Sequence, residues 1–273
     1  MKQLFTISPA PGQDVTQQVL SLRVGEQHIG FSISSHPGNE LLQLAWYTAE
    51  QIGEPELDEL YTQHPELHHS FYSTLVSYEH PQSVLMPVNV FPDADAPVLL
   101  QTMYGVNGNH AIITEKVNDW SLQNSYAVPR NIQEWISRRF PAGHYRHVYS
   151  IGLRQMRDTG GEGTLFVDFR TQDFTVIAIK EGKLLLAQTI CYAASADVIY
   201  YLVKACTEFS FNRETVALEV SGLVEKESNL YRTLTQYFLQ ARFREPTWNM
   251  QAGEASYPAH FFTSFNDLAV CAL

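Results

Sequence analysis

One stretch of the sequence, residues 164–193, constrains the fold more than any other. It reads TLFVDFRTQDFTVIAIKEGKLLLAQTICYA, so that three apolar runs rich in β-branched residues are separated by the short polar breaks RTQD and KEG. Apolar runs of this length, joined by turn-like breaks, are typical of neighbouring antiparallel strands. The stretch therefore predicts a three-stranded meander.

Two helices and two further strands are expected after the meander. Ser195 is a suitable N-cap, and the apolar residues that recur after it at helical spacing are Val198, Ile199, Leu202, Val203, Cys206 and Phe209. The apolar run ETVALEVSG then precedes a second helix that begins at about Ser228, and the short run ARFREP ends the unit. The predicted order of elements is βββαβαβ.

The N-terminal part repeats this order of elements but not the residues. Its first three strand-like runs are residues 19–25, 28–34 and 41–47. A helical pattern with Leu57 and Leu60 follows them. Further along, residues 125–129 predict the next strand, a helix begins at about Asn131, and residues 144–150 predict the last strand.

Residues 74–118 interrupt this first copy. They contain the runs TLVSYEH, SVLMPVNVF and AIITEKV together with several prolines, and they are too long and too strand-like to form a simple loop. We expect an inserted β-rich subdomain here. The predicted fold is therefore of the α/β class, with two RNase H-like domains at residues 1–158 and 159–273 and the insertion in the first.

The composition favours a globular protein that does not bind nucleic acid. The 273 residues carry a net charge of −11, whereas a protein that neutralises phosphates has a basic surface. No window approaches the run of about 18 apolar residues that crosses a bilayer, and the first residues lack the apolar core of a secretory signal. Cys191, Cys206 and Cys271 include no CxxC pair, so neither a disulfide framework nor a zinc site is expected. We expect no membrane span and a location in the cytoplasm.

This duplicated order of elements resembles the ASKHA superfamily of actin, Hsp70 and the sugar kinases, and within it the bacterial actin-like branch of FtsA and PilM proteins. The passages that carry the resemblance are residues 125–150, residues 163–190 and residues 257–273. More narrowly, the chain is similar to a bacterial family catalogued as a domain of unknown function. That similarity lies in the terminal pattern of Pro258, His260, Phe261 and Leu268.

The resemblance implies where a nucleotide would bind. In the superfamily the nucleotide lies between the two halves, and each half contributes a hairpin with the pattern D-x-G at the end of its first strand. Glycine lets backbone N–H groups approach the phosphates, and the carboxylate holds Mg²⁺ or its waters. Here the first hairpin keeps Gly25 but has Arg23 in the place of the carboxylate. The second hairpin keeps Asp168 but has Arg170 in the place of the glycine.

The implied site is therefore a degenerate nucleotide cleft. Its third element, a strand end with two glycines, keeps one of them in Ser221-Gly222. Arginine can bind phosphate bidentately, so a bound nucleotide stays compatible with the sequence, but Mg-dependent hydrolysis is not expected. The candidate cofactor-binding residues are Arg23, Gly25, Asp168, Arg170, Thr171, Ser221 and Gly222. No catalytic residue, no metal site and no cofactor is predicted, and Mg-ATP is the cofactor that the less favoured alternative would use.

Two functions of different classes are open at this point. The first is a non-catalytic scaffold or adaptor that acts through protein–protein contacts, with protein partners of unknown identity and a homodimer as one candidate assembly. The second is an ATP-binding switch or small-molecule phosphotransferase in which Arg23 and Arg170 contact phosphates. We favour the first, because each hairpin lacks half of the phosphate chemistry. A nuclease would need several carboxylates for two metal ions, and Asp168 is the only candidate.

Single residues also have interpretations that involve no ligand. For Arg23, an ion pair between the domains is favoured over a phosphate. For Asp168, the alternative to a ligand is that Arg170 or another donor satisfies the buried carboxylate. The histidines of the segment HPELHH, residues 64–69, differ from the HExxH pattern and predict a surface cluster rather than a metal site.

Overall fold

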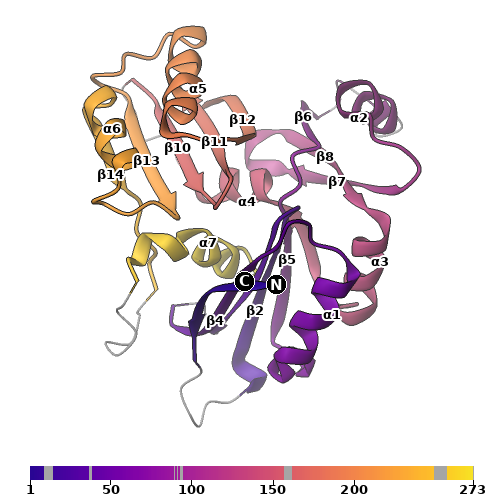
Figure 1. The fold of residues 1–273 in the computed structure, drawn as a ribbon. Helices are drawn as coiled ribbons and strands as arrows, with labels where there is room; N and C mark the ends of the chain where they lie inside the picture. Colours follow the sequence, from indigo (N-terminus) through magenta and orange to yellow (C-terminus); the bar gives the residue numbers. More distant parts are fainter. Residues whose placement is uncertain are drawn as a thin grey trace. The chain divides into compact units, whose positions relative to one another are not determined.

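The computed structural model describes residues 1–8, 15–36, 39–88, 90, 92, 95–156, 162–248 and 257–272 (Figure 1). The chain divides into two compact units. Unit 1 comprises Met1–Arg154, Trp248–Gln251 and Asp267–Leu273, and unit 2 comprises Gln155–Thr247 and Ala252–Asn266. The boundary expected from the sequence, between residues 158 and 159, lies outside the described residues.

Unit 1 is built on a six-stranded sheet with the strand order β1-β4-β3-β2-β5-β9. The strands are β1 (Lys2–Ile7), β2 (Gln18–Val24), β3 (His28–Ser35), β4 (Leu41–Thr48), β5 (Ser73–Tyr78) and β9 (His144–His147). The pairs from β1 to β2 are antiparallel, whereas β5 runs parallel to β2 and β9 runs parallel to β5. The three runs that open the sequence pattern are confirmed as β2, β3 and β4, and β1 is a strand that the pattern does not predict.

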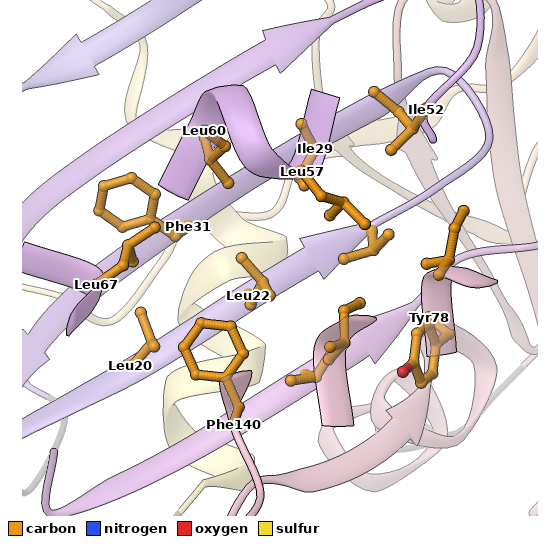
Figure 2. Packing of buried hydrophobic residues seen from close by; sticks show 14 of the residues in the cluster. Leu20, Leu22, Ile29, Phe31, Ile52, Leu57, Leu60, Leu67, Tyr78 and Phe140 are labelled. Atoms are coloured by element: carbon orange, nitrogen blue, oxygen red, sulfur yellow. The ribbon is translucent and has the colours of Figure 1, made fainter. Parts of the chain in front are cut away.

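Two helices, α1 (Glu54–Gln63) and α3 (Arg130–Arg139), contribute to the main core of this unit. Alternate residues of β2 enter this core, because successive side chains of a strand point to opposite faces. Figure 2 shows Leu57 and Leu60 of α1 together with Leu20 and Leu22 of β2 in this cluster. Burial of each such leucine contributes about 1.5–3 kcal/mol.

Between β5 and α3 the chain forms a smaller sheet with the order β6-β8-β7. Its elements are β6 (Ser83–Pro87), α2 (Ala96–Tyr104), β7 (His110–Val117) and β8 (Leu122–Pro129). The inserted part therefore has other limits than the expected 74–118. Residues 73–78 form β5 of the main sheet, and residues 125–129, expected in the main sheet, belong to β8. Both segments are short apolar runs, and periodicity alone does not say with which strand such a run pairs.

Unit 2 contains a five-stranded sheet with the order β12-β11-β10-β13-β14. Its elements are β10 (Thr164–Phe169), β11 (Asp173–Lys180), β12 (Lys183–Cys191), α5 (Ser195–Glu208), β13 (Ala217–Gly222), α6 (Asn229–Tyr237) and β14 (Gln240–Phe243). The predicted meander and the predicted order βββαβαβ are confirmed.

The two helices of unit 2 begin in different ways. The carboxylate of Asp197 accepts the backbone N–H groups of Ala193 and Ala194, both at 2.9 Å, so α5 is capped from its first turn and not by a Ser195 side chain. Helix α6 does have a serine cap, since the Ser228 hydroxyl accepts the N–H of Tyr231 at 3.2 Å.

The remaining helices include α4 (Val148–Gln155) and the C-terminal α7 (Thr263–Cys271). The 3-10 helices are η1 (Val15–Gln17), η2 (Pro65–His68), η4 (Asn118–Trp120) and η5 (Ala259–Phe262). Leu268 of α7 packs with Val19 and Leu75 in unit 1, so the end of the chain joins the first unit and not the second. Within the described ranges, no helix is both long and apolar enough to cross a bilayer.

Candidate functional site

In unit 1 the turn between β2 and β3 carries the first hairpin residues. A two-residue turn joins the strands, and the N–H of Gly25 donates to the carbonyl oxygen of His28 at 2.9 Å. The imidazole of His28 lies against Gly25, because a Cβ added to Gly25 would lie 2.1 Å from the His28 Cε1. The space beside Gly25 is therefore filled by the histidine ring of its own hairpin.

The side chain of Arg23 pairs with Glu79, the residue after β5. Its Nε donates to Oε1 of Glu79 at 2.6 Å and its Nη2 donates to Oε2 at 2.9 Å, which makes the pair bidentate. Both side chains are 0% exposed. The Nε2 of His28 lies 2.9 Å from Oε2 of Glu79, and the Arg23 guanidinium lies 4.6 Å from the ring centre of Trp46. Parallel pairing of β2 and β5 brings both partners together within unit 1, so Arg23 has an ion-pair partner in its own unit. The expected ion pair between domains stays a prediction.

The charges of this cluster stabilise each other. Burial alone would raise the pKa of Glu79, but the positive charge of Arg23 and the hydrogen bond from His28 hold that pKa well below its usual range. Burying an ion costs several kcal/mol, and only good geometry with further hydrogen bonds offsets this cost. Glu79 therefore stays ionised and neutralises Arg23.

In unit 2 the turn between β10 and β11 carries Arg170. Its N–H donates to the carbonyl oxygen of Asp173 at 2.9 Å and closes a two-residue turn whose first residue, Thr171, is exposed. The Arg170 side chain is 1% exposed. Its Nε donates to the Asp173 carboxylate, and its Nη2 donates to the Thr175 hydroxyl at 2.9 Å. The Tyr192 hydroxyl donates to the Arg170 carbonyl oxygen at 3.1 Å.

Asp168, near the end of β10, has two neighbours that satisfy its carboxylate. The Ser221 hydroxyl donates to Oδ1 at 2.8 Å, and the Arg170 Nη1 lies 3.7 Å from Oδ2. Ser221 stands opposite Asp168 in the parallel pairing of β10 with β13. The interpretation that Arg170 or another donor satisfies this carboxylate is confirmed, and the serine is the nearer donor.

Glycine is required at position 222, because β13 and β10 approach each other closely there. Its φ is +81°, a region that L-residues rarely adopt. A Cβ at this position would lie 2.1 Å from the carbonyl oxygen of Phe169, to which the N–H of Leu223 donates at 2.8 Å. Glycine here lets β13 pass close to the end of β10.

The seven predicted site residues thus form two sets. In unit 1 they are Arg23 and Gly25, and in unit 2 they are Asp168, Arg170, Thr171, Ser221 and Gly222. The sequence analysis missed Glu79, His28 and Asp173, the residues that complete both clusters. Glu79 directly follows the apolar run of residues 73–78, and this position could have indicated it as a site residue. That inference requires the run to be assigned to the main sheet.

Side chains that could hold a metal are not grouped in the part of the chain that the structure describes: no three His, Cys, Asp or Glu residues come together in a suitable way there. In the HPELHH segment, the His64 Nδ1 lies 2.8 Å from the Glu66 carboxylate and its Nε2 lies 2.7 Å from the Tyr47 hydroxyl. The His68 Nε2 lies 2.9 Å from the carbonyl oxygen of Tyr61. These two histidines have hydrogen-bond partners within unit 1.

Comparison with known proteins places the chain in a family. A family model described as "Protein of unknown function (DUF3822)" matches residues 13–240, which is most of the chain. The chain belongs to this family. No curated protein matches it.

Comparison with solved structures shows the fold of this chain. A Bacteroides thetaiotaomicron protein with an actin-like ATPase fold and unknown function has a TM-score of 0.76 at 17% identity, with 86% of this chain and 93% of that chain covered. A chain of the PilM–PilN type IV pilus biogenesis complex has a TM-score of 0.67 at 12% identity, with 93% and 98% covered. The predicted actin-like architecture and its PilM-like resemblance are confirmed at the level of the fold.

Proposed function

We propose that this DUF3822 protein is a non-catalytic actin-like scaffold or adaptor that acts through contacts with other proteins. The observation that carries the proposal is the bidentate pair of Arg23 and Glu79, in which both side chains are fully buried. A guanidinium that is already neutralised by a carboxylate of its own unit has little charge left for a phosphate. Under this proposal the nucleotide site of the fold is degenerate.

The first hairpin supports the proposal through its backbone as well. A phosphate loop needs N–H groups that are open to the ligand. Here the N–H of Gly25 donates to His28, and the His28 ring fills the space that glycine leaves. The contacts of Glu79 with Arg23 and His28 also support a hairpin that does not bind Mg²⁺ and a triphosphate.

The second hairpin supports it in a different way. Arg170 uses its backbone N–H and its Nε on Asp173 and its Nη2 on Thr175. Asp168, the carboxylate that would hold Mg²⁺, receives a hydrogen bond from Ser221. The Nε and Nη2 of Arg170 and the carboxylate of Asp168 are thus engaged inside unit 2.

The partner class follows from the fold and the charge. One of the similar structures is a chain of a PilM–PilN complex, in which an actin-like protein occurs in an assembly with another protein. The net charge of −11 argues against nucleic acid as the partner. We therefore propose a protein partner and a location in the cytoplasm.

The proposal is tested by thermal unfolding with Mg-ATP and Mg-ADP. A ligand at 100 times its Kd adds about 2.7 kcal/mol, which corresponds to about 5–10 °C in Tm for a protein of this size. We expect no shift with either nucleotide. The proposal is wrong if three results occur together. Magnesium nucleotide raises Tm, the variant Asp168→Asn no longer shows this rise, and the exposed control Asp119→Asn still shows it.

A further inference from the structure

A cavity of about 360 Å³ lies in unit 1, beside the turn of the first hairpin. It is lined by that turn, by the segment between β4 and α1, by the residues after β5, and by residues of β7, β8 and α3. The cavity is therefore walled by both sheets of unit 1. Its size is at the lower end of small-ligand sites, which are about 300–1,000 Å³.

Two carboxylates stand at the opening of this cavity. Glu26 and Glu50 both line it and both are exposed. Glu26 accepts a hydrogen bond from the Gln82 amide at 3.1 Å, and that amide is neutral. Among the described residues, no Lys, Arg or His side chain forms a salt bridge with either carboxylate. The opening therefore carries negative charge that the described part of the protein leaves uncompensated.

His80 contributes to the cavity from its buried side. Its side chain is 2% exposed, and its Nδ1 has no hydrogen-bond partner. Burial, together with the neighbouring His147, lowers the pKa of His80 to about 3, so the ring is neutral at physiological pH. A buried polar atom without a partner costs about 1–3 kcal/mol. A ligand that supplies the missing partner would recover part of this cost.

The basic side chains that the structure describes around the cavity form no ion pair with Glu26 or Glu50. His110 also lines it. The guanidinium of Arg130, which follows β8, lies nearby but donates to the carbonyl oxygens of Gly108 and His110, at 3.4 Å and 3.2 Å. This arginine is therefore directed at backbone oxygens and not at Glu26 or Glu50.

The remaining wall is apolar. Ile52 and Ile132 are each 2% exposed, and Pro129 lies beside them. A ligand that fits both surfaces must be cationic at one end and tolerate apolar contact on its faces. A guanidinium meets both conditions, because it is planar, carries five donors and is weakly hydrated, whereas an ammonium is compact and strongly hydrated.

We propose that this cavity binds a guanidinium group, with Glu26 and Glu50 as its anionic partners and His80 as a neutral hydrogen-bonding partner. The group has two possible sources, an arginine side chain of a protein and a free guanidinium compound. The site adjoins the first hairpin cluster, since Glu26 lies in the turn between β2 and β3, but it uses Glu26, Glu50 and His80 and none of the seven predicted site residues. It does not depend on the absence of nucleotide chemistry, so it stands or falls apart from the adaptor function.

The test is an NMR titration of the full chain, with amide signals followed as ligand is added. The probe is N-acetyl-L-arginine methylamide, and its matched control is the corresponding citrulline compound, which has the same shape without the charge. Concentrations reach about 20 mM, since one ion-paired group gives affinities of millimolar order. We expect the arginine compound to shift the amides of residues 26–27, 50–52 and 80–82, and the citrulline compound to leave them in place.

Variants test the assigned residues. Glu26→Gln and Glu50→Gln should each weaken binding by about twofold to fivefold, the scale of an exposed ion pair, and binding should weaken further as salt is added. The control Glu214→Gln removes an exposed carboxylate in unit 2 and should change nothing. Because the substituted residues are exposed, these variants are expected to fold.

The source is decided with n-butylguanidine, a free guanidinium compound that has a single positive charge and no acyl backbone. Tighter binding of n-butylguanidine indicates a small-molecule ligand, and tighter binding of the arginine methylamide indicates a protein side chain. The proposal is overturned if neither compound shifts the cavity amides. It is also overturned if citrulline methylamide shifts them equally, or if both glutamate variants bind as the unchanged protein does.

Discussion

Ser77 and Ser221 occupy the same register position in the two sheets. Ser77 stands opposite Arg23 in the pairing of β2 with β5. Ser221 stands opposite Asp168 in the pairing of β10 with β13. Each hydroxyl donates to a carboxylate of its own unit, Ser77 to Glu79 at 3.5 Å and Ser221 to Asp168 at 2.8 Å. The duplication therefore extends beyond the order of elements to single hydroxyl groups.

The charges around these serines are arranged in opposite ways. In unit 1 the strand carries the cation, Arg23, and the anion follows the neighbouring parallel strand. In unit 2 the strand carries the anion, Asp168, and the cation Arg170 lies in the turn. In both cases the charges are paired within the unit that carries them. Stability experiments on these pairs can therefore be designed separately for each unit.

Arg23→Met should destabilise unit 1 by about 3–5 kcal/mol, because it leaves the Glu79 carboxylate buried without its main cation. Urea unfolding followed by tryptophan fluorescence measures this. The probe is selective, since the four tryptophans, Trp46, Trp120, Trp135 and Trp248, all belong to unit 1.

The control for this experiment removes both charges. The double variant Arg23→Met with Glu79→Leu should be more stable than Arg23→Met alone, because apolar residues of similar volume often replace a buried ion pair at little cost. A double variant that is less stable than the single one would show that the cost comes from lost packing and not from the unpaired carboxylate.

The fold could be predicted from the sequence to the extent that local patterns determine it. Residues 164–193 form three consecutive strands joined by short turns, so composition and turn residues are sufficient. The choice between residues 73–78 and residues 125–129 as the strand that pairs in parallel with β2 depends on long-range pairing. Both runs look alike locally, and only tertiary contacts distinguish them.

The candidate site was predictable in part for the same reason. Arg23 and Arg170 could be placed in the hairpins, because their positions follow from the strands that contain them. The partner of Arg170 is three residues away, at Asp173, whereas the partner of Arg23 is 56 residues away, at Glu79. The partner of Arg23 could be predicted only from the strand order of the sheet, which the sequence pattern does not contain.

His80 should make the stability of unit 1 depend on pH between about 6.5 and about 3. Its folded pKa is about 3 against an ordinary value of 6.5, so the unfolded chain binds more protons in this window and stability falls as pH is lowered. The slope contributed by one such group is up to about 1.4 kcal/mol per pH unit. His80→Gln should reduce this slope in urea unfolding followed by tryptophan fluorescence. Equal slopes in both proteins would contradict the assignment of a neutral buried ring.

Gly222→Ala should destabilise unit 2 by about 2–5 kcal/mol. About 1–2 kcal/mol comes from the left-handed backbone, and about 1–3 kcal/mol comes from the contact of the new Cβ with the Phe169 carbonyl oxygen. The matched control is Gly182→Ala, where φ is +69° and no atom lies within 4 Å of the added carbon. The control should lose only the stability that comes from the left-handed backbone, about 1–2 kcal/mol. Far-UV circular dichroism during thermal unfolding measures both, and equal losses would argue against a close approach of β13 to β10.

Arg170→Gln separates a structural arginine from a phosphate-binding one. The substitution removes the charged hydrogen bonds to Asp173 and Thr175, so a loss of about 1.5–3 kcal/mol is expected. The matched control is Arg232→Gln, because Arg232 is 65% exposed and lies 3.7 Å from Glu227, a surface pair worth at most about 1 kcal/mol. Thermal unfolding of both variants, with and without Mg-ATP, should show the difference in stability and no response to nucleotide. If Arg170→Gln costs no more than Arg232→Gln and abolishes a nucleotide response present in the unchanged protein, then Arg170 binds phosphate and the adaptor proposal fails.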